Sequence, residues 1–247
     1  MITSKQNQMV KRVALLKTKK GREEQGLFVV EGYKMISDAI SYGMEIEEIF
    51  VTIANENLFK NAPVTPILVS DSVFKCISDE VTPQGSLAVL KIPKSGAISR
   101  LSRCLLLDRV QDPGNVGTIM RLATACGVKD VLLIDSADPY SPKAVRSSMS
   151  GIYHVNVYRV TEEEIISLLK EQSVNLICAD MDGENIFDFA PPSRFCLCVG
   201  NEGNGISDNL INSANSVISI PMQKGIESLN VSVATGVTLY TLLNNRR

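Results

Sequence analysis

Short apolar strands that alternate with helices, from Cys104 to the C-terminus, constrain the fold of this chain more than any other feature. The expected strands are 104–108, 131–135, 154–159, 175–180, 195–199 and 217–220. Between them, the spacing of apolar residues predicts helices at about 115–126, 141–150, 161–171, 206–213 and 230–244. Apolar strands joined by helices are typical of a parallel sheet that helices cover on both faces. We therefore predict an α/β domain, with right-handed double winding as its default topology.

The N-terminal part of the chain carries a second, smaller α/β pattern. Its expected strands are 26–32, 47–52, 65–70 and 85–92, and its expected helices are 33–42 and 70–78. The segment KIPKSGAISR follows, and its proline, glycine and small polar residues make it the best linker candidate. A chain of 247 residues favours two domains, or one large domain. We place them at 1–96 and 97–247.

Composition excludes several classes of protein. No apolar run approaches the roughly 18 residues that a membrane span requires, and the basic N-terminus has no apolar core of the signal-peptide type. We therefore expect a cytoplasmic protein without a membrane segment. The six cysteines form no C-x-x-C pair and His154 is the only histidine, so we expect no metal site and mostly buried, reduced thiols. A lone histidine also gives little support to Ser-His-Asp or Cys-His catalysis.

Charge is distributed unevenly, although the net charge is only −2. Seven basic residues precede the first acid, Glu23: Lys5, Lys11, Arg12, Lys17, Lys19, Lys20 and Arg22. Such an arm can meet a phosphate backbone. The apolar residues Met9, Val10, Val13 and Leu16 keep helical spacing in the same segment. One face of this helix can therefore pack while the other carries charge, and an ordinary solvated helix explains the segment too.

Three loops at the expected carboxyl ends of strands stand out, because ligands of parallel sheets collect there. The first follows Asp108 and reads DRVQDPGNVGTIMR. Its turn ends before Asn115, a plausible N-cap, and Gly117 allows close backbone approach. Arg121 lies one and a half turns into the next helix. Taken alone, an ordinary strand–turn–helix with a surface arginine explains this segment equally well.

The second and third loops are rich in glycine and amide side chains. CVGNEGNGIS, at 198–207, lets backbone N–H groups approach a ligand, but it fits neither the dinucleotide fingerprint nor the Walker A pattern. The third loop begins after a short strand that ends at Pro221. Ser228 or Asn230 can cap the long helix that follows. Capping explains one of these two polar residues and leaves the other open.

Together these loops resemble the SpoU/TrmH family of RNA 2′-O-ribose methyltransferases, within the SPOUT superfamily. The resemblance covers about 104–244. It is carried by N-x-G-x-x-x-R at Asn115, Gly117 and Arg121, by G-N-E-G at Gly200 to Gly203, by I-P-M at Ile220 to Met222, and by S-L-N-V-S-V-A at Ser228 to Ala234. The segment FVVEGYKMISDAI, at 28–40, is less specifically similar to the RNA substrate-binding domain of many members, which has a ribosomal-protein-like α/β form.

The resemblance implies a fold, a cofactor and a set of site residues. The fold is an α/β trefoil knot, and the cofactor is S-adenosyl-L-methionine, bound without metal. The implied cofactor contacts are Gly200, Ile220 and Leu229, with Met222 and Ser228 added by position. The implied catalytic or substrate-binding residues are Asn115, Arg121, Glu202, Ser228 and Asn230. The implied substrate is RNA rather than DNA, and the ribosomal-like N-terminal domain favours ribosomal RNA over transfer RNA.

Alternatives remain open from the sequence. A knotted enzyme that methylates a base and a non-catalytic ribosome-assembly factor share many of these features. The family's proposed base, Arg121, has a guanidinium that stays protonated in proteins, so we favour a role in binding phosphate and stabilising negative charge. The helix at 230–244 has more apolar residues than one face needs, namely Val231, Val233, Val237, Leu239, Leu242 and Leu243. With the resemblance, this predicts a homodimer.

Overall fold

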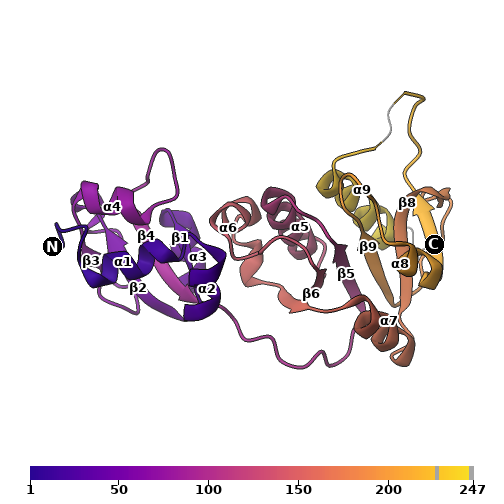
Figure 1. Ribbon diagram of the computed structural model, residues 1–247, viewed down its shortest axis with the longest axis horizontal. Helices are drawn as coiled ribbons and strands as arrows, with labels where there is room; N and C mark the ends of the chain where they lie inside the picture. Colours follow the sequence, from indigo (N-terminus) through magenta and orange to yellow (C-terminus); the bar gives the residue numbers. More distant parts are fainter. Residues whose placement is uncertain (226–227, 245–247) are drawn as a thin grey trace. The chain divides into compact units, whose positions relative to one another are not determined.

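The computed structural model describes residues 1–225 and 228–244, which form two compact units (Figure 1). The first unit comprises Met1–Lys94 and Asp138–Tyr153, and the second comprises Ser95–Ala137 and His154–Arg247. The sequence predicted a single crossing between domains, between residues 96 and 97. The contacts instead make the chain cross three times, because the segment 138–153 packs with the N-terminal residues.

The first unit contains a mixed sheet with the strand order β1-β4-β2-β3. Its strands are β1 (Leu27–Glu31), β2 (Ile46–Val51), β3 (Ile67–Leu68) and β4 (Ser86–Lys91). Its helices include α1 (Gln8–Leu15), α2 (Lys19–Gln25), α3 (Tyr33–Ser41) and α4 (Asp71–Ile77). β4 runs antiparallel to β1 and β2. Val10, Val13 and Leu16 enter the core with Phe50 and Phe74, which confirms the packed face of the N-terminal helix.

The segment 138–153 contributes α6 (Pro142–Ser148) and the short 3₁₀ helix η2 (Gly151–Tyr153) to the first unit. The helix predicted at about 141–150 is therefore present, but it packs on β1 and not as cover for the parallel sheet. The Tyr140 ring lies 5.1 Å from the Phe28 ring, and the Asp138 carboxylate accepts from the Arg22 guanidinium at 2.6 Å. Apolar spacing marked the buried face of this helix, but it could not identify the sheet that buries it.

The basic N-terminal arm is largely engaged with its own unit. Arg12 pairs with Glu48 at 2.5 Å, and Arg22 is 3% exposed and pairs with Asp138. Lys17, Lys19 and Lys20 contact the Ser78 carbonyl, Glu23 and Glu24 respectively. Within the described ranges, Lys5 and Lys11 alone among the seven have no side-chain partner. The role of this arm in binding RNA stays a prediction. Most of its cationic side chains already contact groups of the first unit.

The second unit contains a parallel sheet, which confirms the predicted α/β class. Among the described residues the strand order is β10-β8-β9-β5-β6-β7, and every pair is parallel. The strands are β5 (Arg103–Asp108), β6 (Asp130–Ile134), β7 (Asn156–Arg159), β8 (Asn175–Asn185), β9 (Phe195–Val199) and β10 (Ser216–Ser219). The helices include α5 (Pro113–Ala125), α7 (Glu162–Glu171), α8 (Asp208–Ser213) and α9 (Val231–Asn244).

Both faces of this sheet are buried. Cys104 and Leu106 share one core cluster with residues of α7 and α8. Leu105 and Leu107 alternate to the opposite face and are equally buried, on the side left to α5 and α9, which pack against each other. Cys104, Cys178, Cys196 and Cys198 are free and fully buried, as expected. The trefoil knot stays a prediction from the resemblance.

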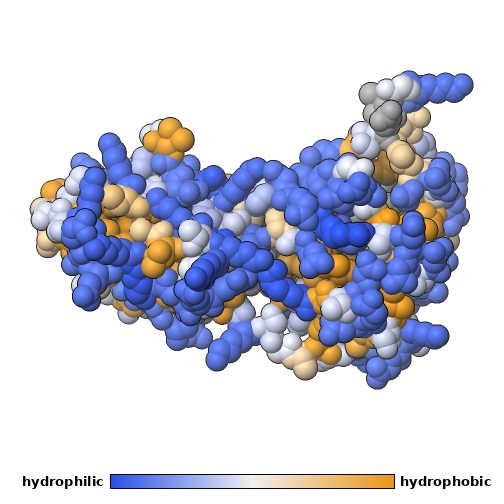
Figure 2. All heavy atoms as spheres, in the orientation of Figure 1, coloured by the Kyte–Doolittle hydropathy of each residue, from blue (hydrophilic) through white to orange (hydrophobic). Residues whose placement is uncertain are grey.

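The visible surface is largely hydrophilic, with separate hydrophobic side chains between the polar ones (Figure 2). In the described part of the chain, no helix combines the length and apolar character needed to cross a membrane.

The Arg22–Asp138 pair yields a stability prediction. Removing one partner of a buried ion pair leaves an uncompensated charge, which costs about 3–5 kcal/mol. Asp138→Ala should therefore lower the free energy of unfolding by that amount in urea titrations. The matched control is Glu24→Ala, which removes the partner of exposed Lys20 and should change little. Equal unfolding midpoints for both variants would contradict the prediction.

Candidate active site

The three polar loops follow β5, β9 and β10, at the carboxyl ends of the parallel strands. β5 and β9 are hydrogen-bonded neighbours in the middle of the sheet, so their loops emerge side by side. The chain leaves edge strand β10 and returns as α9, which packs on α5 and contacts β9 (Figure 1). The first residues of α9 are thereby brought to the first two loops. This is the position where open parallel sheets bind ligands.

The start of α5 differs from the sequence prediction in one respect. Asp112, and not Asn115, is the N-cap: its Oδ1 accepts from the Asn115 backbone N–H at 3.0 Å, and Pro113 occupies the first helical turn. Asn115 is the third residue of the helix. Its side chain is therefore released from capping and can take part in a site.

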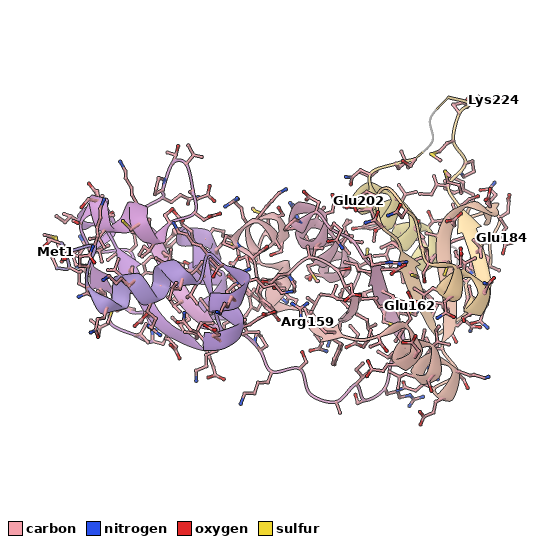
Figure 3. The ribbon with its side chains drawn as sticks, in the orientation of Figure 1. Met1, Arg159, Glu162, Glu184, Glu202 and Lys224 are labelled. Carbon is pink, nitrogen blue, oxygen red and sulfur yellow. The ribbon has the colours of Figure 1, made fainter. Side chains whose placement is uncertain are left out.

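Three predicted site residues meet through hydrogen bonds, and we call Asn115, Glu202 and Asn230 the polar triad. Asn115 Nδ2 donates to Glu202 Oε1 at 2.8 Å, and Asn230 Nδ2 donates to Asn115 Oδ1 at 3.0 Å. Glu202, labelled in Figure 3, comes from the glycine-rich loop after β9. The Asn230 Oδ1 atom accepts from the backbone N–H groups of Ser232 and Val233, so Asn230 also caps α9. The side-chain amide of Asn115 thus connects all three loops, because it donates to Glu202 and accepts from Asn230.

The glycine-rich loop after β9 is folded tightly on itself. Asn201 and Gly205 exchange two backbone hydrogen bonds of 2.9 and 3.0 Å, and Asn201 Oδ1 accepts from the Gly203 and Asn204 amides. A Cβ on Gly200 would lie 2.3 Å from the Gly205 carbonyl carbon. Gly200 is therefore needed for the close approach of two backbone segments within the loop itself.

Asp108 and Arg109 anchor this loop, and the sequence analysis did not single them out as site residues. Asp108 is fully buried, and its Oδ2 accepts from the Ser207 amide at 2.8 Å and from Arg109 at 2.7 Å. The bond to Asp108 raises the pKa of the Arg109 guanidinium. Arg109 has a φ of 55°, and its carbonyl accepts from Asn201 Nδ2 at 2.8 Å. A carboxylate at the end of an apolar strand was the available sequence signal.

The other predicted catalytic residue, Arg121, lies further along α5. It is six residues beyond Asn115, which corresponds to about 9 Å along a helix axis. Its side chain is exposed and has no hydrogen bond or ion pair within the described residues. Arg121 does not contact the polar triad through any bond the structure contains. It remains available to a substrate.

The predicted cofactor contacts lie on two of the three loops, the one after β9 and the one after β10. Gly200, Ile220 and Met222 are partly buried, while Ser228 and Leu229 are exposed, with Leu229 at 38%. Within the described ranges, the backbone groups of Gly200, Ile220, Met222 and Leu229 make no hydrogen bond. These donors and acceptors are available to a ligand. Anywhere in the described ranges, no group of three or more His, Cys, Asp or Glu side chains could hold a metal ion.

The fold and the site define a class: an open parallel α/β domain with three polar loops at its carboxyl edge, where enzymes of this architecture bind nucleotide-type cofactors. Residues 102–240 match the SpoU rRNA Methylase family, and residues 7–88 match the MRM3-like substrate binding domain. The chain belongs to the SpoU rRNA methylase family.

Relatives match along almost the whole chain. The 23S rRNA (guanosine(2553)-2'-O)-methyltransferase RlmP of Bacillus subtilis is 32% identical, covering 98% of both chains. A putative TrmH-family RNA methyltransferase structure from Porphyromonas gingivalis has a TM-score of 0.85 at 30% identity, with 98% of both chains covered. The SpoU methyltransferase AviRb of Streptomyces viridochromogenes, in complex with AdoMet, has a TM-score of 0.88 at 26% identity, also covering 98% of both chains.

The glycine-rich loop yields a prediction with an internal control. Gly200→Ala should force Gly200 away from Gly205 and break the paired bonds of the loop. Hydrogen exchange of the Asn201 and Gly205 amides should accelerate at least tenfold, which corresponds to about 1.4 kcal/mol of local opening. Gly203→Ala should leave exchange unchanged, because its Cβ would meet Asn201 Oδ1 at 3.6 Å, an ordinary contact. Equal protection in both variants would refute this account of the loop.

Proposed function

We propose that this chain transfers a methyl group from S-adenosylmethionine to a ribose 2′-hydroxyl of RNA, with ribosomal RNA as the substrate class. The observation that carries the proposal is the polar triad, which joins the three family motifs at the carboxyl edge of the sheet. The substrate class is supported by a relative named as a 23S rRNA 2′-O-methyltransferase, whose sequence aligns with almost the whole chain. We further propose that the enzyme acts in the cytoplasm and not on DNA.

The residues around the glycine-rich loop fit the cofactor. The backbone groups of Gly200, Ile220, Met222 and Leu229, which form no hydrogen bond within the described residues, can hold the adenosine and amino-acid parts, and Ser228 precedes Leu229 in the chain. The tight loop at Gly200 keeps side-chain atoms away from its backbone. When bound, S-adenosylmethionine supplies a methyl group on a positively charged sulfur. Two structures of relatives contain AdoMet, which supports this assignment.

The polar triad orients groups for this reaction. Each side-chain amide has two N–H donors. Asn115 uses one of them on Glu202, and Asn230 uses one on Asn115, so each retains an N–H for the substrate ribose or phosphate. Glu202 accepts from Asn115, and its Oε2 also accepts from the backbone N–H of Gln111 at 3.5 Å. The triad therefore presents fixed donors, and fixed donors need no rearrangement when charge develops.

Arg121 supplies positive charge. A guanidinium is not deprotonated in proteins, so it cannot take the proton of the ribose hydroxyl. Because Arg121 is exposed and unpartnered within the described residues, it can bind a substrate phosphate in two places and stabilise negative charge on the 2′-oxygen. The proton then passes to a phosphate oxygen or to water.

We expect Arg121→Ala to bind S-adenosylmethionine normally and to lose about 10²–10³-fold in single-turnover methyl transfer, the usual effect of one lost charge-stabilising donor. Arg121→Lys should retain part of the rate if charge matters more than the planar fork. Calorimetry measures binding, and mass spectrometry of the methylated nucleoside measures transfer. The control is Lys129→Ala, an exposed cation next to the amino end of β6.

Two results would contradict the proposed function, and a third would contradict the role of Arg121. A base-methylated nucleoside would assign the enzyme to a different reaction. Absence of S-adenosylmethionine binding in the wild-type chain would make it an RNA-binding factor. Wild-type rates in Arg121→Ala would remove this residue from the mechanism and leave the polar triad.

We also propose a homodimer formed through α9. Three apolar residues of this helix are already buried within the second unit and are not available to a partner: Val231, Leu239 and Leu242. Val233 and Tyr240 are 52% and 49% exposed, and they lie seven residues apart on one face. This narrower face is the candidate contact.

Light scattering at micromolar concentration should give a dimer mass for the wild-type chain and a monomer mass for Val233→Glu, because a buried unpaired carboxylate opposes association. Phe187→Glu, which changes a 58% exposed side chain on the segment after β8, should remain dimeric. A monomeric wild-type chain would overturn the assembly.

A further inference from the structure

A cavity of about 180 Å³ lies in the first unit. It is separate from the loops at the carboxyl edge of the parallel sheet, because all its lining residues belong to the first unit. The lining comes from the end of β1, the start of α3, the segment 79–87, and α6 with the turn that follows it (Figure 1). Neither the family motifs nor the proposed reaction uses these residues.

The charge of the lining is acidic. Four carboxylates line the cavity: Glu31, Asp38, Asp79 and Glu80. Two cations also line it, and both are already paired, Lys34 with Asp38 at 2.7 Å and Arg146 with Glu80 at 2.5 Å. Glu31 and Asp79 form no ion pair within the described residues, so the four carboxylates and two cations leave a formal excess of two negative charges in the lining.

These two carboxylates differ in their surroundings. Glu31 accepts from Ser78 Oγ at 2.6 Å and from the backbone N–H of Gln84 at 3.0 Å, and burial raises its pKa. Asp79 is exposed and has no side-chain partner within the described residues. A carboxylate has about four acceptor positions, so both residues can accept further hydrogen bonds. A guest that carries positive charge and several donors would satisfy them.

Much of the remaining lining is aliphatic or methionine, beside the polar Gln84 and Ser150. Val29, Met35, Leu87, Val145 and Met149 line the cavity, and no aromatic ring does so among the described residues. RNA bases are held by stacking on aromatic rings or arginine planes, and Arg146 is committed to Glu80. The excess of carboxylates over cations in the lining also disfavours phosphates. These features favour an aliphatic stem with a cationic head over a nucleotide.

The rim of the cavity is held in an unusual backbone conformation. Met149 and Ser150 are consecutive non-glycine residues with φ of 46° and 70°. Ser150 Oγ donates to Asp38 Oδ2 at 2.7 Å, and Tyr153 Oη donates to the Met35 carbonyl at 3.2 Å. Left-handed conformations cost free energy and cluster at ligand-binding sites. Two bonds to α3 keep this rim in place.

We propose that this cavity is a docking site for an arginine or lysine side chain on a basic segment of a partner protein. The size agrees with one side chain, because an engineered protein cavity of about 150 Å³ accommodates a benzene molecule. The apolar walls receive the methylene stem, and Glu31 and Asp79 receive the cationic head. The proposal does not depend on the methyl-transfer reaction, so each can fail without the other.

The test uses the full chain with ¹³C-labelled methionine methyl groups. Titration with the peptide acetyl-Gly-Arg-Gly-amide, or its lysine counterpart, should shift the Met35 and Met149 signals saturably and leave those of Met181 and Met222 unchanged. Asp79→Asn should weaken peptide affinity about tenfold, the scale of one lost charge-assisted hydrogen bond. Glu31→Gln should weaken it similarly. Glu56→Gln, an exposed carboxylate of the same unit outside the cavity, should have no effect.

Several outcomes would overturn the proposal. Equal binding of a peptide with neutral citrulline in place of arginine would show that charge is not recognised. Shifts caused by a single-stranded oligonucleotide at lower concentration would assign the cavity to RNA. Tighter binding of free spermidine would assign it to a polyamine. Unchanged methionine signals with both peptides at millimolar concentration would show that no basic side chain docks there.

Discussion

The parallel pairing of β5 with β9 is the constraint on which the site depends. The two strands lie in register in the middle of the sheet, with Leu107 opposite Val199, so the chain leaves both strands at the same edge. Each strand is fully buried at this end. Asn115 and Glu202 lie 87 residues apart in the sequence, and they meet because their strands are neighbours. The start of α9 then completes the polar triad.

A buried polar anchor supports this arrangement. Asp108 ends β5 inside an apolar sheet and stabilises the loop after β9 through the Ser207 amide. Arg109 adopts a left-handed conformation that places its carbonyl against Asn201. Backbone strain of this kind persists only where surrounding bonds hold it, and it is common at functional sites. Strain at Arg109 therefore agrees with a loop that must keep one geometry.

The first unit shows a different principle. A helix from the middle of the chain, α6, packs on its strand β1, and the buried Arg22–Asp138 pair joins residues 116 positions apart. The same segment brings Arg146 and Ser150 to an acidic cavity. A stretch that sequence periodicity marks as an ordinary crossover helix thus contributes to the surface of another unit. Its residues Asp138, Arg146 and Ser150 bond to side chains of that unit.

Sequence patterns by themselves determined the class and order of the elements. Short apolar strands and amphipathic helices are local properties, so their positions followed from spacing, and the polar motifs followed from their place at strand ends. Tertiary structure alone decided three further points. Asp112 caps α5, which leaves the Asn115 side chain free of that role. Helix α6 packs on β1. Acidic side chains of the first unit form ion pairs with most of the basic arm. Each depends on contacts between residues distant in sequence or on a choice among competing cap residues, which local periodicity does not encode.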